Sequence, residues 1–141
     1  MPKKEKIIFI CTGNACRSQI AEGVMRKLAG DKFDVFSAGS HPSLVHPMSI
    51  KVMKEIGIDI TSHTSDPISN FLSKNMDIVV TVCDNADKIC PVFPGEVERI
   101  HWSIKDPFKG WELNPDDLVN FTRTRDDLIE RIKNFVKDRL V

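Results

Sequence analysis

The stretch CTGNACRSQ, residues 11–19, follows the apolar run IIFI at residues 7–10. A short apolar run rich in isoleucine is typical of a central parallel strand that is covered on both faces. After the quoted stretch, apolar residues recur at helical spacing as far as Gly30; they are Ile20, Ala21, Val24, Met25 and Leu28. Residues 6–30 therefore predict a strand, a tight loop that Ser18 ends, and a helix that stops at Gly30.

Outside this unit the chain continues to alternate strand and helix patterns. The helix predicted at HPMSIKVMKEIG has Pro47 in its first turn and Gly57 just past its end. An amphipathic face predicts a closing helix over residues 115–140. Three further strands are predicted, at VFSAG (35–39), IVVTV (78–82) and VERIHW (97–102).

This alternation predicts one α/β domain over residues 1–141, a doubly wound parallel sheet with helices on both faces. Ligands bind such sheets at the carboxyl ends of the strands. Cys11 and Cys83 each follow a predicted strand, so we expect both at that edge of the sheet.

The charge balance narrows the function. Twenty basic residues match twenty acidic ones, which gives no support for nucleic-acid or membrane-surface binding. No apolar run reaches the roughly 18 residues of a membrane span. We expect a soluble, cytoplasmic monomer, whose four cysteines, in a reducing compartment, are reactive, metal-binding or inert rather than permanently bridged.

The loop itself points to a tetrahedral oxyanion. Cys11 and Arg17 are separated by five residues, and Gly13 permits tight curvature. Inward backbone N–H groups and a helix N-terminus favour an anion, while the planar fork of Arg17 would grip two of its oxygens. The same field stabilises a thiolate, so we expect Cys11 to be ionised, with the Ser18 hydroxyl as its hydrogen-bond donor.

Cys83 and Cys90 are the second distinctive feature. If the segment between them is helical, they lie about 10.5 Å apart along the axis at about 1.5 Å per residue. A disulfide needs Cα atoms at about 4.4–6.8 Å, so a bridge between them would require the segment to unwind. From spacing alone, both remain compatible with packing in the core, and a four-cysteine zinc site is a weaker alternative.

CTGNACRSQIAEG (residues 11–23) resembles the phosphate-binding loop of the low-molecular-weight protein tyrosine phosphatase superfamily, which includes the thioredoxin-coupled arsenate reductases. VVTVCDNADKICPVFP (79–94) is similar to the reductase segment that carries the second and third redox cysteines. The resemblance covers nearly the whole chain and implies a three-layer sandwich around a four-stranded parallel sheet. Its further matches are SAG (37–39), MKEIGIDIT (53–61), HTSD (63–66), HW (101–102) and DP (106–107).

The reductase resemblance implies a three-cysteine relay. Cys11 attacks arsenate, Cys83 attacks Cys11 to release arsenite, and Cys90 moves the disulfide to the surface for thioredoxin. Asp106 is the candidate general acid, and Ser18 supports the nucleophile. The residues expected to bind the substrate are Thr12, Gly13, Asn14, Ala15, Cys16 and Arg17.

Two departures separate the chain from the phosphatase branch. In phosphatases of that branch, Asp-Pro is followed by aromatic residues, often tyrosines, that form the walls of a slot for a phenyl ring. This chain contains no tyrosine, and the corresponding sequence is DPFKGW. Gln19 also stands where phosphatases usually carry proline. Ala15, where reductases usually have serine, leaves the backbone cradle intact. The alternatives are a low-molecular-weight phosphatase hydrolysing phosphate monoesters, an anion sensor, and a reductase coupled to glutaredoxin.

No resident cofactor is required by this reading. The resemblance does imply a potassium site near the loop, with bracing hydrogen bonds as the alternative role; its oxygen ligands would be Asn14, Glu22, Ser37, Thr64 and Asp66. Cys16 is interpreted as an inert packing residue rather than as a backup partner for Cys11. The histidines lack the spacing of a metal set and are interpreted as structural; they are His41, His46, His63 and His101.

Overall fold

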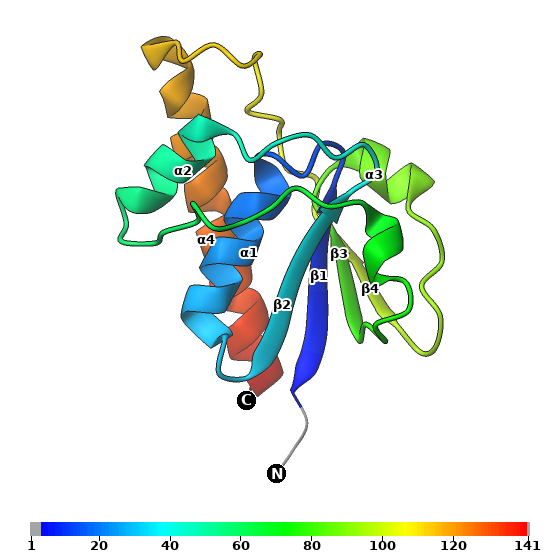
Figure 1. Ribbon diagram of the computed structural model, residues 1–141. Coiled ribbons are helices and arrows are strands. Elements are labelled where there is room, and N and C mark those ends of the chain that lie inside the picture. The colour runs from blue at the N-terminus through cyan, green and yellow to red at the C-terminus, as the bar shows by residue number, and fades with distance from the viewer. Residues whose placement is uncertain (1–3, 141) are drawn as a thin grey trace.

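The computed structural model describes residues 4–140 and contains one four-stranded sheet (Figure 1). Its strands are β1 (Glu5–Cys11), β2 (Phe33–Gly39), β3 (Ile78–Thr81) and β4 (Glu98–His101). The order across the sheet is β2-β1-β3-β4, and every pairing is parallel. The predicted four-stranded parallel sheet is confirmed.

Helices cover both faces of the sheet (Figure 1). One side carries α1 (Arg17–Ala29), α2 (Pro47–Lys54) and the long α4 (Leu118–Leu140). The other side carries the short helix α3 (Asp84–Ile89) and the 3-10 turn η1 (Ile68–Phe71). The closing helix predicted from residue 115 begins as a second 3-10 turn, η2 (Pro115–Asp117), which the Asn114 side chain caps.

Burial follows the apolar pattern of the sequence. Residues 7–10 of β1 are fully buried, as expected for a strand with neighbours on both sides and helices on both faces. Phe121, Leu128 and Ile132 of α4 are buried where that helix packs against α1 and α2. Leu28 follows the apolar spacing of α1 but is 41% exposed, beside Ile56 in a surface groove.

Gly30 ends α1 as predicted, but for a steric reason. Its φ of −64° is ordinary right-handed backbone, so left-handed freedom is not what the position requires. A Cβ at this residue would collide with the backbone carbonyl of Arg26, which accepts the capping N–H of Gly30. Glycine is therefore selected here by close backbone approach.

From β1 the chain passes to β2 on one side of it and then to β3 on the other, so the strand order changes direction between β1 and β3. This switch point sets the location of the site. β1 ends at Cys11, and Cys83 follows β3 after one further residue, Val82, whose N–H still donates to the carbonyl of Ile10. The two cysteines therefore lie at neighbouring strand ends, where doubly wound sheets bind ligands. Within residues 4–140, no helix combines the length and apolarity that crossing a bilayer demands.

Candidate active site

The loop between β1 and α1 carries the predicted nucleophile. The Cys11 Sγ lies 2.9 Å from the Ser18 Oγ, and both residues are buried. The Asn14 Nδ2 donates to that same Ser18 Oγ at 2.7 Å. Because this bond occupies a lone pair of the hydroxyl, the Ser18 proton is available to the sulfur, where it would stabilise a thiolate.

Asn14 fixes the shape of the loop. Its φ of 47° lies in the left-handed region, which asparagine tolerates better than most residues. Its Nδ2 also donates to the Ser37 Oγ at 3.0 Å, and its Oδ1 accepts from the Asp66 backbone N–H at 2.9 Å. Gln19 donates to the Asn14 carbonyl at 3.0 Å, so the loop is held from α1 as well as from the sheet.

Arg17 and Asp106 face each other beside this loop. The Arg17 Nη1 donates to the Ile104 carbonyl at 3.1 Å, and its Nη2 lies 3.5 Å from the Asp106 Oδ2. The Arg17 side chain is only 12% exposed, whereas that of Asp106 is 52% exposed. A positioned cation and a solvent-reachable carboxyl group thus lie next to the nucleophile.

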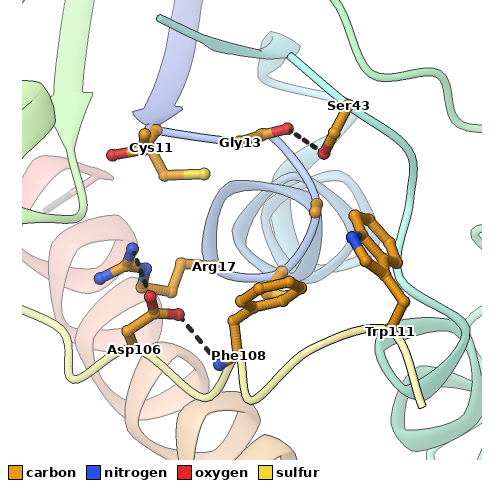
Figure 2. Close-up of a pocket in the computed structure, with 10 residues that line it drawn as sticks. Cys11, Gly13, Arg17, Ser43, Asp106, Phe108 and Trp111 are labelled. Carbon is orange, nitrogen blue, oxygen red and sulfur yellow. Dashed lines mark hydrogen bonds and ion pairs between the residues drawn. The ribbon is translucent and has the colours of Figure 1, made fainter. Parts of the chain in front are cut away.

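These groups surround a cavity of about 300 Å³ (Figure 2). Cys11, Arg17 and Asp106 lie at one end, and Phe108 and Trp111 at the other. The lining also includes the predicted substrate residues Thr12, Gly13, Ala15 and Cys16; Asn14 is instead buried behind the loop.

Sequence reasoning missed part of this lining. Phe108 and Trp111 supply aromatic walls despite the absence of tyrosine, and DPFKGW was the available signal. Ser43, which donates from its Oγ to the Gly13 carbonyl at 3.2 Å, gave no signal in the sequence.

The second predicted thiol is linked to the first loop by a hydroxyl. Cys83 caps the N-terminus of α3, where its sulfur accepts from the Ala86 N–H at 3.3 Å. The Thr12 Oγ1 lies 3.4 Å from the Cys83 Sγ and itself accepts from the Asn85 Nδ2 at 3.2 Å. Thr12 neighbours Cys11 in sequence, so the structure brings Cys11 and Cys83 to one side of the loop.

Cys90 lies at the opposite end of α3. The segment between Cys83 and Cys90 is helical, as the spacing argument assumed, and all four cysteines are unbridged. Cys90 is partly buried, and burial raises the pKa of its thiol. Within residues 4–140, no group of three or more histidine, cysteine or acidic side chains is arranged to hold a metal.

Cys16 sits against the cradle but in a different environment. Burial, followed by the nearby Cys11, raises the pKa of Cys16 to about 12. A thiol that stays protonated at neutral pH is a poor nucleophile. The structure therefore supports the interpretation of Cys16 as an inert packing residue.

A polar network that the sequence did not reveal ties α3 to the sheet. The Thr81 Oγ1 donates to the Asp87 Oδ1 at 2.9 Å and lies 2.8 Å from the His101 Nδ1. The His101 Nε2 lies 2.9 Å from the Asp84 Oδ1, and Arg99 donates to the Asp87 carbonyl at 2.6 Å. These contacts hold Asp84 and Asp87, the first and fourth residues of a helix of only six.

The five residues of the predicted potassium set come together at one place. Glu22, Ser37, Thr64 and Asp66 line a cavity of about 210 Å³, and Asn14 bonds to two of them from behind. Oxygen atoms of these side chains also bond to one another, as from the Thr64 Oγ1 to the Asp66 Oδ2 at 2.7 Å. The set has the oxygen chemistry that a hard cation prefers.

The same cavity contains its own cationic group. The Arg26 Nη2 lies 2.8 Å from the Glu22 Oε2, and the His63 Nε2 lies 3.5 Å from the same oxygen. Burial lowers the pKa of His63, which favours its neutral form, and its Nδ1 lies 3.0 Å from the Gln19 Oε1. Arg26 is thus the charged partner of Glu22 in this structure.

Comparisons with known proteins agree with this geometry. The profile of the low molecular weight phosphotyrosine protein phosphatase family matches residues 6–140. An arsenate reductase from Halalkalibacterium halodurans is 46% identical over 134 residues, 95% of this chain and 96% of that protein. A solved arsenate reductase in the phosphate binding state has a TM-score of 0.81 and 36% identity, covering 95% of this chain and 98% of the other.

A third relative bears on the electron donor. The thioredoxin-dependent arsenate reductase Cg_ArsC1' of Corynebacterium glutamicum has a TM-score of 0.75 and 27% identity, covering 96% of this chain and 61% of that one. These comparisons do not favour the alternative of a phosphate monoester hydrolase.

Proposed function

Because the chain belongs to the low molecular weight phosphotyrosine protein phosphatase family and has relatives that are arsenate reductases, we propose that it reduces arsenate to arsenite. The observation that carries the proposal is a second thiol beside the loop of the first: the Cys83 Sγ lies 3.4 Å from the Oγ1 of Thr12, which follows Cys11 in the loop that lines the cavity. Hydrolysis needs one thiol, whereas reduction of arsenic from the five-valent to the three-valent state takes two electrons. Two thiols supply these electrons by becoming a disulfide.

The first step forms a bond between sulfur and arsenic. Arg17 and the loop N–H groups hold the oxygens of arsenate, and the Cys11 thiolate attacks the arsenic atom. One arsenic–oxygen bond breaks, and that oxygen leaves as water with a proton from Asp106. The hydroxyl of Ser18, 2.9 Å from the Cys11 sulfur, is placed to donate a hydrogen bond to the attacking atom.

The second step transfers the electrons. Cys83 attacks the Cys11 sulfur, the sulfur–arsenic bond breaks, and its electron pair remains on arsenic, which leaves as arsenite. The product is a disulfide between Cys11 and Cys83. The Thr12 hydroxyl and the Ala86 N–H stabilise the attacking Cys83 thiolate by hydrogen bonding to it.

The third step moves the disulfide outward. Cys90 attacks Cys83 and frees Cys11, which requires α3 to unwind because its two ends are too far apart to bridge. Thioredoxin then reduces the bridge between Cys83 and Cys90 by thiol–disulfide exchange. The name of the Corynebacterium relative supports thioredoxin as this reductant.

Potassium is proposed as a supporting ion. Glu22, Ser37, Thr64 and Asp66 would hold it with their oxygens, while Asn14 transmits the ordering to the loop. When bound, the ion supplies positive charge that offsets the two carboxylates. Melting temperature in potassium chloride against sodium chloride tests this: wild type should gain stability in potassium and Asp66→Asn should not, and equal melting temperatures for wild type in both salts would contradict it.

The test of the whole function is thioredoxin-coupled arsenate reduction with disulfide mapping by mass spectrometry. Wild type treated with arsenate and no reductant should accumulate the Cys83–Cys90 bridge, and Cys90→Ser should stop at a Cys11–Cys83 bridge. Cys83→Ser should release no arsenite catalytically, and Cys16→Ala serves as the matched thiol control. Normal multiple turnover by Cys83→Ser would refute the relay, and replacement of thioredoxin by glutathione and glutaredoxin tests the electron donor.

A further inference from the structure

His46 connects three parts of the active site although it lies outside the cavity lining. It is 1% exposed and caps α2, where its Nδ1 accepts from the Met48 N–H at 3.1 Å. Its Nε2 lies 2.9 Å from the Gly110 carbonyl oxygen. Since Nδ1 accepts, a neutral ring carries its proton on Nε2 and donates it to Gly110. The His46 backbone N–H donates to the Ala15 carbonyl of the anion loop at 3.0 Å.

The His46 ring is also packed among aromatic side chains. Trp111 stacks on it with centroids 5.1 Å apart and an interplanar angle of 14°. Phe108 meets its edge at 5.8 Å, and Phe121 of α4 lies 4.8 Å from it. These contacts fix the ring plane and the direction of the Nε2–H group, so the bond to Gly110 has a defined geometry.

The residues that His46 holds belong to the segment that carries Asp106. Residues 102–114 connect β4 to η2 without regular secondary structure, so their position depends on contacts with other elements. Arg17 bonds to the Ile104 carbonyl on one side of Asp106, and His46 bonds to the Gly110 carbonyl on the other. The Asp106 side chain is half exposed, and its Oδ1 accepts from the Phe108 N–H at 3.0 Å, so its position depends on the path of this segment.

We propose that His46 is a positioning residue that holds Asp106 at the mouth of the oxyanion cradle, through Gly110, Phe108 and Trp111. The inference rests on the proposed function, because it assigns His46 an effect on proton transfer by Asp106. It assigns no contact between His46 and the substrate. Loss of the Nε2–H and of the ring lets the 102–114 segment move, and displacements of about 1 Å in such groups reduce rates strongly.

A double-mutant cycle tests this, with the single-turnover rate of arsenite release as the readout. His46→Asn keeps an acceptor that caps α2 but removes the Nε2–H and the ring. It should slow the wild-type reaction about tenfold and the Asp106→Asn variant less than about twofold, because the positioned acid is already absent. Trp111→Ala should likewise slow the wild-type reaction more than it slows the Asp106→Asn variant. Trp111 is 44% exposed, so this truncation does not endanger the fold.

Ser49→Ala is the matched control. The Ser49 Oγ donates to the same Ala15 carbonyl as the His46 backbone, and no hydrogen bond joins Ser49 to residues 102–114. Ser49→Ala should change the single-turnover rate by the same factor in wild type and in the Asp106→Asn variant. The inference is overturned if His46→Asn slows Asp106→Asn as much as wild type, or if it leaves wild type at full rate while Asp106→Asn is slow. A wild type that reduces no arsenate, or an Asp106→Asn variant at full rate, instead refutes the proposed function.

Discussion

Thr81→Val should accelerate the transfer of the disulfide from Cys11 to Cys90. Thr81 is a fully buried residue of β3, and its Oγ1 donates to the Asp87 Oδ1 of α3 at 2.9 Å. Valine has nearly the same shape and leaves the sequence of α3 unchanged, so the helix keeps its intrinsic propensity. The substitution therefore weakens the attachment of α3 to the sheet, and unwinding of α3 becomes easier.

The size of the effect is worked from the bond to Asp87, which joins Thr81 directly to α3; the contact of the Thr81 Oγ1 with the His101 Nδ1 lies within the sheet. A hydrogen bond to a charged group contributes about 1.5–3 kcal/mol when it is shielded. The Asp87 side chain is 36% exposed and water replaces part of the lost bond, so we take about 1 kcal/mol. At about 1.4 kcal/mol per tenfold, the population of unwound α3 rises about fivefold. The Cys83–Cys90 disulfide should form faster by the same factor.

Two measurements check this prediction. Rapid alkylation after mixing with arsenate, followed by peptide mapping, gives the rate at which the Cys83–Cys90 bridge appears. Hydrogen exchange reports opening of the α3 amides, whose protection should fall about fivefold. Lys88→Ala, at an exposed position of the same helix, is the control and should change neither quantity more than about twofold. Faster exchange with an unchanged or slower bridge formation would refute the role of unwinding.

Three further changes test the site. Arg17→Lys should lower kcat/KM for arsenate about tenfold to a hundredfold, because a point charge replaces a planar fork; a change below threefold would contradict the cradle. The pKa of Cys16 is raised from 9.0 to about 12 in the folded protein, so the folded state favours the protonated thiol. The stability of the wild type should therefore fall as the pH rises above about 9, where the thiol ionises in the unfolded chain. Cys16→Ala should make the melting temperature fall less steeply between about pH 8.5 and 10.5. Asn14→Ala should cost about 2–3 kcal/mol in urea unfolding, since it leaves buried partners unpaired and places alanine at a left-handed φ; a loss under about 1 kcal/mol would contradict this.

The part of the fold that is local in sequence could be predicted. Residues 6–30 contain a continuous apolar run, typical of a buried strand, and then apolar residues at helical spacing. The loop is therefore bounded on both sides by recognisable patterns. The carboxyl-end rule then places Cys11 and Cys83 together without any knowledge of side-chain contacts. Leu28 shows the limit: helical spacing assigns a residue to a face, but whether a neighbour covers that face depends on distant elements.

The contacts that position the chemistry could not be predicted in the same way. Thr81 and Asp87 meet because β3 and α3 pack together, and neither residue type has a pattern that marks a partner. His46 was interpreted as structural, because the histidines lack the spacing of a metal set. Its bond to Gly110, 64 residues away, depends on an irregular segment whose path has no periodicity to read.

The hydrogen bonds around the thiols fit the order of steps in the proposed relay. In two places an asparagine amide occupies a hydroxyl oxygen whose proton then points at sulfur: Asn14 through Ser18 to Cys11, and Asn85 through Thr12 to Cys83. In both arrangements the hydroxyl has its proton free to donate to the neighbouring sulfur.

Cys90 differs in its hydrogen bonding, since its sulfur donates to the Pro91 carbonyl at 3.5 Å and burial raises the pKa of its thiol. It becomes a good nucleophile only when it leaves this position, and the unwinding that brings it to Cys83 is the movement that exposes it. In the proposed relay, deprotonation of Cys90 would therefore be coupled to unwinding, which would suppress attack by Cys90 before arsenite has left.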